Sequence, residues 1–301
     1  MNRTAAPHLA RRGGALALAA CLLVSCSAQR DPTGGLDRAA SPGAAVGRTG
    51  LPSVPARDAA TLARQLDGVL ATLRNPDAAT TDVRRAGELQ QLAEGTLALA
   101  SSAFRRQVMA RLDPRTALVV RDDVRAARLL HAMTAPQKKL PPWRIVAPPP
   151  PTELLGYYRE AQRRTGVPWT YLAAIHLVET RMGRIRGAST AGARGPMQFL
   201  PSTWTMYAAG GDINDPHDAI LAAARLLKAN GAPGHMARAV WHFNPSDRYV
   251  GAVSAYARTM QRAPYTYRGY WHWRVLYRQA RGTYVLPVGY PDTPAVLLRG
   301  S

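Results

Sequence analysis

One carboxylate stands alone in a stretch that contains no other acidic residue. The stretch "ETRMGRIRGASTAGARGPMQFLPSTW" begins with Glu179, and the next acidic residue is Asp212. Leu172 and Ile175 precede this carboxylate at helical spacing and Met182 follows it, so all four share one face of a predicted helix. Burial on an apolar face disfavours the anion and raises the pKa, which suits Glu179 to general acid catalysis near neutral pH.

Two other interpretations of Glu179 follow from the same spacing. A buried glutamate can be structural, satisfied by Arg181, Arg184 or a backbone group. Glu179 and His176 also have an H-x-x-E spacing, which could bind a metal together with distant histidines. The histidines available for this are His217, His235 and His242. Because the chain lacks an H-E-x-x-H pair, we predict no metal site and no cofactor.

The acidic segment "GDINDPHD" lies just downstream, from Asp212 to Asp218. Its alternating oxygen ligands could hold Ca²⁺, but the later bidentate glutamate of an EF-hand loop is missing. Asp215 directly precedes Pro216, and this order is typical of a helix N-cap followed by a first-turn proline. We therefore predict a turn and a helix cap in this segment.

Helices must position these side chains, and the apolar periodicity indicates where they lie. Pro168 and Pro216 mark helix starts, and Gly183 and Gly231 mark helix ends. The predicted helices cover residues 153–165, 168–182, 201–208, 216–230, 234–243 and 247–261. The fold class is therefore mainly α. The aromatic and β-branched residues 265–288 predict a short hairpin or an irregular flap.

In the N-terminal half, the sequence predicts a helical segment between a flexible stretch and an extended one. Residues 56–135 contain one helix around Leu62 to Leu73, a second, longer helix from Leu89 to Val108, and a third over residues 122–133. The proline-rich residues 136–151 predict an extended linker and a boundary. Residues 26–55 combine a cysteine with a flexible tether of Ala, Gly, Ser and Pro.

The first 25 residues resemble a bacterial lipoprotein signal. Arg3, Arg11 and Arg12 precede an apolar run that is too short to span a bilayer. The run ends in "LVSC", which resembles a lipobox and implies cleavage before Cys26 and a lipid on its sulfur. A plain signal peptide is the alternative, and the arginine pair leaves the export route open. Cys21 lies in the removed segment, so no disulfide is predicted.

The chain is strongly basic. It has 39 Lys+Arg against 19 Asp+Glu, a formal net charge of +20, and 47% hydrophobic residues, enough for a sizeable core. Such a charge attracts polyanions, among them anionic wall polymers, unless it reflects a general compositional bias. Zinc-finger spacing, an aromatic RNP-like run and Lys/Arg blocks are missing from the sequence, so nucleic acid is not predicted as a partner.

Four ordered motifs carry a family resemblance. "VETRMG", "GASTAGARGPMQFLPSTW", "DPHDAILAAARLLKANGA" and "AVWHFNPSDRYVGAVSAY" resemble the soluble lytic transglycosylase family over residues 154–261, and "GPMQFLP" is especially similar to its membrane-bound lytic transglycosylase B branch. The resemblance implies a lysozyme-like helical domain over residues 152–262, followed by an aromatic and basic extension over residues 263–301. It also implies cleavage of peptidoglycan between N-acetylmuramic acid and N-acetylglucosamine, in the cell envelope.

The resemblance also assigns roles to single residues. Glu179 matches the sole catalytic acid and base, and Tyr249 matches a tyrosine that positions it. The residues that match substrate-binding positions are Ser189, Met197, Gln198, Asn244 and Tyr249. The family has a tyrosine directly before the asparagine that Asn244 matches. This chain has Phe243 there, which lacks the hydroxyl but keeps the aromatic ring.

A single carboxylate is sufficient for a transglycosylase but not for an ordinary glycoside hydrolase, which uses two. In a transglycosylase the sugar's own C6 hydroxyl replaces water, which gives a 1,6-anhydro end. Two alternatives remain: a hydrolytic muramidase that pairs Glu179 with Asp212, Asp215 or Asp247, and a catalytically silent peptidoglycan-binding protein. The tail aromatics could stack on sugars, although packing onto the domain is favoured; they are Tyr265, Tyr267, Tyr270, Trp271 and Trp273.

Overall fold

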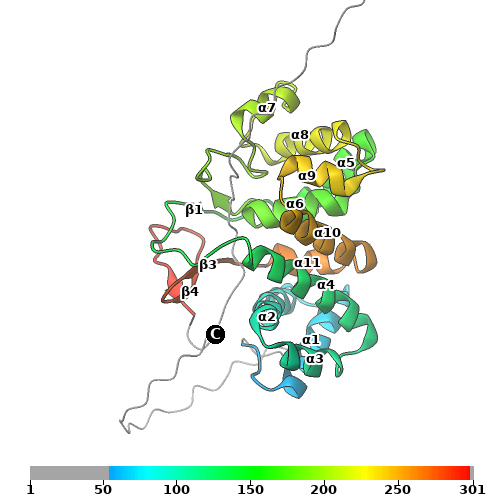
Figure 1. Ribbon diagram of the computed structural model, residues 1–301, viewed down its shortest axis with the longest axis vertical. Coiled ribbons are helices and arrows are strands. Elements are labelled where there is room, and N and C mark those ends of the chain that lie inside the picture. The colour runs from blue at the N-terminus through cyan, green and yellow to red at the C-terminus, as the bar shows by residue number, and fades with distance from the viewer. Residues whose placement is uncertain (1–53, 299–301) are drawn as a thin grey trace, which may run out of the picture.

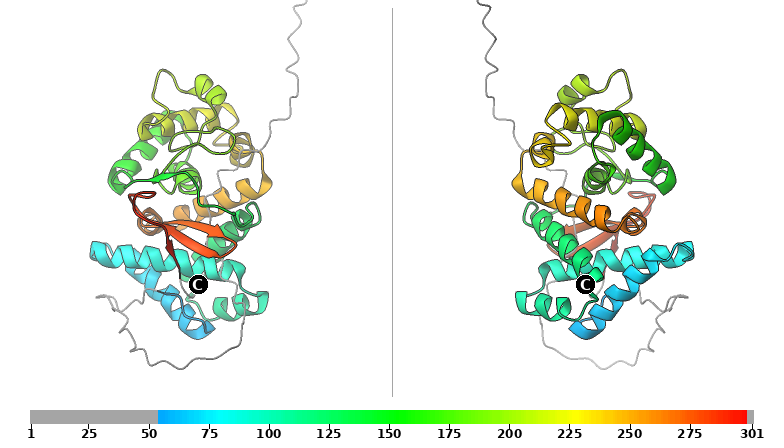
Figure 2. Two further views of the ribbon diagram at one scale, coloured as in Figure 1. Left: turned by 90° about the vertical axis from the view of Figure 1, so that its left-hand side faces the viewer. Right: turned by 90° about the vertical axis from the view of Figure 1, so that its right-hand side faces the viewer.

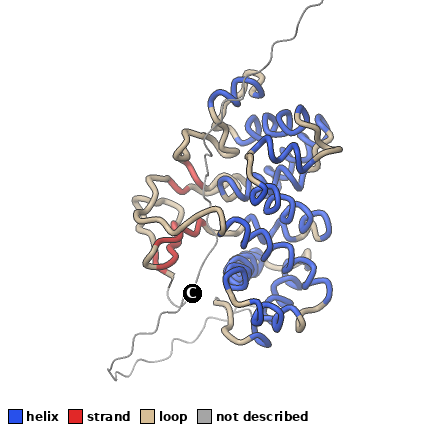
Figure 3. Tube along the Cα trace, in the orientation of Figure 1, coloured by secondary structure: helices blue, strands red, loops and turns tan. Residues whose placement is uncertain are grey.

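A computed structural model describes residues 54–298 of the chain, and it confirms the mainly helical fold class (Figure 1). Helices make up most of the described part, and short strands gather on one side of it (Figure 3). The predicted signal segment, Cys26 and nearly all of the predicted tether lie outside the described residues. No helix among the described residues is long and apolar enough to cross a membrane.

In the described part of the chain, four helices precede the proline-rich segment: α1 (Ala59–Arg74), α2 (Thr80–Leu99), α3 (Ser102–Met109) and α4 (Pro114–His131). The prediction of one long helix from Leu89 to Val108 was wrong. Ala100 is extended, and the Ser101 hydroxyl accepts a hydrogen bond from the Phe104 amide, so a new helix begins there. The third helix starts earlier than predicted, because Asp113 caps it and Pro114 occupies its first turn.

The proline-rich segment is more than an extended linker. Within it, β1 (Arg144–Ile145) pairs antiparallel with β2 (Ile185–Arg186), which follows the α6 helix described next. Ile145 and Ile185 are buried in one apolar cluster with Val275. The segment is therefore anchored to the chain just beyond Glu179, a pairing between distant positions that local proline content does not reveal.

The six helices predicted after residue 151 are all present. They are α5 (Pro151–Thr165), α6 (Trp169–Thr180), α7 (Pro201–Tyr207), α8 (Pro216–Ala229), α9 (Met236–Phe243) and α10 (Asp247–Arg262). The central one, α6, is buried along nearly its whole length and packs against α5, α8 and α10. It ends two residues before the predicted end, because Arg181 and Met182 adopt left-handed backbone conformations.

The C-terminal tail begins with a helix where a flap or hairpin was expected. That helix is α11 (Thr266–Trp271), and the predicted hairpin follows as β3 (Val275–Gln279) and β4 (Gly282–Leu286), with β5 (Val296–Leu297) beside β4 in an antiparallel sheet. Tyr267, Tyr270 and Trp273 are buried. These aromatic residues pack the tail onto the helices, as favoured by the sequence.

The core continues from the N-terminal helices into the helices around α6. One apolar cluster includes Leu62 of α1, Leu97 of α2, Leu172 of α6 and Tyr256 of α10. In both side views α4 lies against α10, with α1 and α2 on its far side (Figure 2). The division of the chain into separate domains remains a prediction.

A buried polar network joins the same layers. Asp123 of α4 is fully buried and accepts hydrogen bonds from Thr259 of α10 (2.8 Å), Tyr270 of α11 (2.7 Å) and Gln90 of α2 (3.2 Å). Glu94 of α2 is also buried and shares the amide of Gln90. Burial raises the pKa of both carboxyls, that of Asp123 to about 7, so the pair retains a proton near neutral pH.

Candidate active site

Glu179 lies one residue before the end of α6, surrounded by core. Only 5% of its surface is exposed, and its Oε1 accepts a hydrogen bond from the Tyr249 hydroxyl at 2.5 Å. Burial raises the pKa of Glu179 to about 8, and the Tyr249 bond opposes part of that rise because it favours the anion. The carboxyl is therefore protonated at neutral pH and has a donor ready for its ionised form.

The two arginines that could have neutralised Glu179 pack against aromatic rings. The guanidinium of Arg181 lies 5.5 Å from the ring centre of Trp273, and that of Arg184 lies 5.2 Å from that of Trp271. Arg181 also donates to the Leu177 carbonyl at 2.9 Å. Arg181 and Arg184, which the sequence offered as structural partners of Glu179, thus have these other contacts instead.

Tyr249 is held in place by the start of α10 and by a stack of rings. Ser246 caps α10, and its hydroxyl accepts a hydrogen bond from the Tyr249 amide at 3.4 Å. The Phe243 ring lies almost parallel to the Tyr249 ring, 6.4 Å away, and meets Phe199 edge-on at 5.8 Å. Phenylalanine at position 243 therefore provides ring packing beside Tyr249. Asn244 ends α9 and is half-buried.

Thr180 connects Glu179's helix to the "GPMQF" segment, a role that the sequence analysis missed. Its buried hydroxyl donates to the Pro196 carbonyl at 2.6 Å and accepts from the Gly183 amide at 3.1 Å. Met197, directly after Pro196, is fully buried in the main core cluster. The only sequence feature that pointed to this role was the hydroxyl residue directly after the glutamate in "VET". Threonine at a helix end occurs in many other roles, so the feature was not specific.

Replacing Thr180 with valine is expected to lower the free energy of unfolding by about 2 kcal/mol. Valine keeps the shape but leaves a buried amide and a buried carbonyl without their partner. Chemical denaturation of the purified protein measures the difference. Thr180→Ser, which keeps the hydroxyl, is the matched control and should lose less than half as much; equal losses would show that the methyl group, and not the hydroxyl, matters.

Gln198 and Ser189 shape the loop between α6 and α7. The Gln198 amide group donates to the carbonyls of Gly195 (2.9 Å) and Gly187 (3.3 Å), and its backbone is left-handed. The Ser189 hydroxyl accepts from the Ala193 amide at 3.0 Å. A Cβ at Gly195 would lie 1.9 Å from the Ile213 carbonyl oxygen, so only glycine fits there.

A hollow of about 210 Å³ opens beside this loop, lined by Gly187 and Gly195 among others. Arg186 and Arg194 also line it, so its surface carries positive charge. Gly187 and Gly195, whose carbonyls accept hydrogen bonds from the Gln198 side chain, thus line this hollow. Ser189, Met197, Gln198 and Asn244 remain predicted substrate-binding residues.

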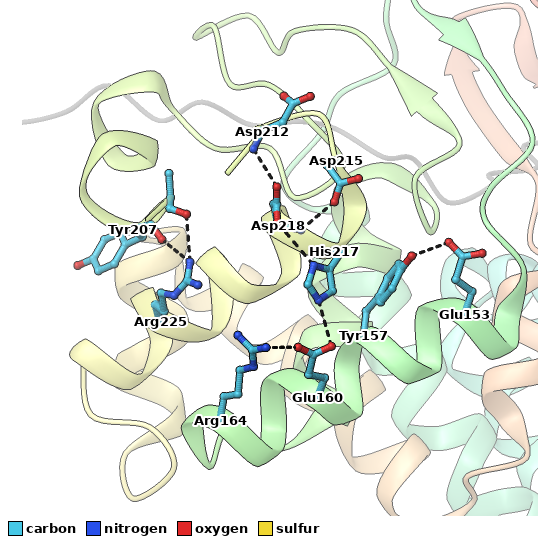
Figure 4. A network of polar contacts seen from close by, with 11 residues as sticks. Glu153, Tyr157, Glu160, Arg164, Tyr207, Asp212, Asp215, His217, Asp218 and Arg225 are labelled. Atoms are coloured by element: carbon cyan, nitrogen blue, oxygen red, sulfur yellow. Dashed lines mark hydrogen bonds and ion pairs between the residues drawn. The ribbon is translucent and has the colours of Figure 1, made fainter. Parts of the chain in front are cut away.

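The acidic segment before α8 is a turn and a helix cap, as predicted (Figure 4). Asp215 accepts a hydrogen bond from the Asp218 amide at 3.0 Å, and Asp218 accepts from the Asp212 amide at 2.9 Å. His217 contacts Glu160 of α5 at 3.0 Å. Asp215, His217 and Asp218 lie close enough together to hold a metal ion. The turn and the helix cap account for this proximity without a metal.

His176, the other half of the H-x-x-E spacing, belongs to the core. It is fully buried, and its Nδ1 lies 2.7 Å from the Tyr158 hydroxyl. Burial lowers its pKa to about 3, so the imidazole is neutral. Among residues 54–298, the group of side chains able to gather around a metal ion includes neither His176 nor Glu179.

Comparison with known protein families agrees with this geometry. Residues 156–261 match the family described as "Transglycosylase SLT domain", and the match spans α5 to α10 with Glu179 and Tyr249 inside it. Comparisons with curated proteins and with solved structures gave no match. The match supports a lysozyme-like helical domain, and the matched family is that of lytic transglycosylases, which act on peptidoglycan.

Proposed function

We propose that the protein is a lytic transglycosylase that cleaves the β-1,4 bond between N-acetylmuramic acid and N-acetylglucosamine in peptidoglycan and forms 1,6-anhydromuramic ends. One observation carries the proposal: a buried carboxyl, protonated at neutral pH, receives a hydrogen bond from Tyr249 inside the matched domain. One acid group in such an environment can donate a proton and then take one back.

In the proposed reaction, protonated Glu179 donates its proton to the glycosidic oxygen, and the bond to C1 of muramic acid breaks. The carbonyl of the substrate's own N-acetyl group stabilises the developing positive charge at C1. The Glu179 carboxylate, which keeps its hydrogen bond from Tyr249, takes the proton of the C6 hydroxyl. The C6 oxygen forms the new bond to C1. Glu179 ends protonated, and water takes no part.

Intramolecular attack depends on how well the sugar is held. Asn244 and the Gln198 loop, which lie between Glu179 and Tyr249 in sequence, supply polar groups, and Ser189 shapes the same loop. We assign Ser189, Met197, Gln198, Asn244 and Tyr249 to substrate binding. Arg186 and Arg194, at the adjoining hollow, add positive charge that suits the carboxylates of peptidoglycan stem peptides.

The proposed place of action is the cell envelope, outside the cytoplasm. The support is the peptidoglycan substrate of the matched family, together with the N-terminal segment that resembles a lipoprotein signal. In this proposal Cys26 carries the lipid that holds the protein at a membrane. Anionic wall polymers are further candidate partners for a chain with a net charge of +20.

Mass spectrometry of the products from purified peptidoglycan tests the reaction. The proposal expects muropeptides that are one water lighter than hydrolysis products and resistant to borohydride reduction. Reducible ends would instead indicate a muramidase with a second carboxylate, Asp212, Asp215 or Asp247. Retained binding to the glycan without soluble products would indicate a silent binding protein.

The hydrogen bond from Tyr249 predicts a distinctive pH effect. Cleavage by the natural protein should decline as pH rises through about 8, where Glu179 loses its proton. In Tyr249→Phe, the anion loses a donor, so this decline should move to higher pH while the maximal rate falls about tenfold. A pH–rate profile of both proteins measures both effects. An unchanged profile would mean that Tyr249 does not act on Glu179.

A further inference from the structure

A second cavity, of about 380 Å³, opens between α2, α3 and α4, away from the candidate active site. Its apolar lining comes from Leu97 and Val124, which are nearly fully buried, and from the half-buried Met109. Its rim carries five arginines: Arg105, Arg106, Arg121, Arg125 and Arg128. In all views α2 and α3 lie toward the opposite end of the molecule from α7 and α8, and α4 lies between them and α10 (Figures 1 and 2).

The positive charge around this cavity is not neutralised by the protein. Arg121, Arg125 and Arg128 follow one face of α4 at helical spacing, where like charges repel. No ion pair within residues 54–298 joins any of the five rim arginines to a carboxylate. Burial, and after it the neighbouring Arg128 and Arg106, lower the pKa of Arg105.

The acidic residues of the same helix face elsewhere. Asp122 forms ion pairs with Arg258 (3.3 Å) and Arg262 (2.7 Å) of α10. Asp123 is part of the buried hydrogen-bond network. The sequence of α4 thus places its carboxylates against α10 and its arginines around the cavity. A cationic rim over an apolar floor complements a ligand with an anionic head and a hydrocarbon portion.

We propose that this cavity is a binding site for an anionic phospholipid, with the phosphate held by the rim arginines and the first part of an acyl chain against Leu97, Met109 and Val124. Its volume falls within the range of known small-ligand sites. Planar guanidinium groups bind phosphate oxygens in pairs. Such a site would hold these helices at an anionic membrane surface independently of any lipid on Cys26.

Isothermal titration calorimetry of the full-length chain with short-chain lipids, kept below their micelle-forming concentrations, tests the site without a membrane. The probes are dihexanoylphosphatidylglycerol, its zwitterionic phosphatidylcholine analogue, and glycerol phosphate, which has the anion alone. The anionic lipid is expected to bind at least about tenfold more tightly than either of the others, and more weakly at high salt.

The double variant Arg121→Ala/Arg125→Ala removes two rim charges and should weaken binding of the anionic lipid about tenfold or more. Arg159→Ala/Arg163→Ala is the matched control, because these arginines are exposed, share the same spacing on α5 and do not line the cavity. Binding of glycerol phosphate as tight as that of the anionic lipid would show a site for the anion alone and would overturn the proposal. Binding of the zwitterionic lipid as tight as that of the anionic lipid, or equal losses in both double variants, would also overturn it.

Discussion

Replacing Glu179 with glutamine is expected to lower the rate of glycan-strand cleavage at least about a thousandfold. Glutamine keeps the size and a carbonyl oxygen for the Tyr249 hydroxyl, but it has no proton to donate and cannot accept one. Both halves of the proposed reaction use the same carboxyl, so both fail together. Quantifying released muropeptides per unit time by liquid chromatography and mass spectrometry gives the rate ratio.

Glu160→Gln is the matched control for this result. Glu160 also lies inside the matched domain, on α5, but it is partly exposed and contacts Arg164 and His217 at the start of α8. The control should keep a rate within about threefold of the natural protein, since surface ion pairs contribute little to stability. Equal losses in the two variants, or substantial cleavage by Glu179→Gln with unchanged products, would remove Glu179 from its proposed role.

The second large effect concerns stability. Asp123→Ala is expected to lower the free energy of unfolding by about 3 kcal/mol or more, because it removes an acceptor that three buried donors share. Those donors are on Gln90, Thr259 and Tyr270, each from a different helix. Denaturant unfolding, followed by circular dichroism, measures the loss.

The neighbouring Asp122→Ala provides the comparison. Asp122 pairs with two arginines whose side chains are 34% and 45% exposed, so water can replace much of what is lost. We expect a cost of about 1 kcal/mol or less. If the two alanine variants unfold at the same denaturant concentration, the buried network does not hold the helices together as described.

The same carboxyl makes stability depend on pH. The folded pKa of Asp123 is raised by burial to about 7, above the usual value in an unfolded chain. The folded protein therefore holds more protons, and the contribution of this carboxyl to stability is complete below about pH 4 and is lost as pH rises through about 7. Asp123→Asn should flatten the curve of melting temperature against pH. An unchanged slope would show that another group, such as Glu94 or Glu179, dominates it.

The periodic parts of the structure could be predicted from the sequence. The apolar positions around Leu172 and Ile175 predicted α6 and the burial of Glu179, and Asp215 with Pro216 predicted the start of α8. These features depend on neighbours three or four residues away, so local spacing contains the information. The exact end of α6 could not be predicted, because Arg181 takes a left-handed conformation that its side chain does not favour.

Long-range contacts were beyond sequence reasoning. The pairing of β1 with β2 joins residues about forty positions apart, and no turn signal links them. The burial of Asp123 could not be predicted, because it depends on donors from α2, α10 and α11. Thr180 was missed for the same reason, since its partner Pro196 is fixed only by the folded loop.

The packing of α10 between α6 and α4 bears on how this chain could be shortened or recombined. The family match ends at residue 261, yet α10 is buried toward both neighbours, with Val253, Tyr256 and Thr259 among its covered residues. Excised alone, residues 156–261 would present the α4-facing side of α10 to water, and the excised piece would tend to aggregate. In this chain the matched region packs against the helices before it, so a fusion that swaps only the matched region would need to bring a matching α4 surface with it.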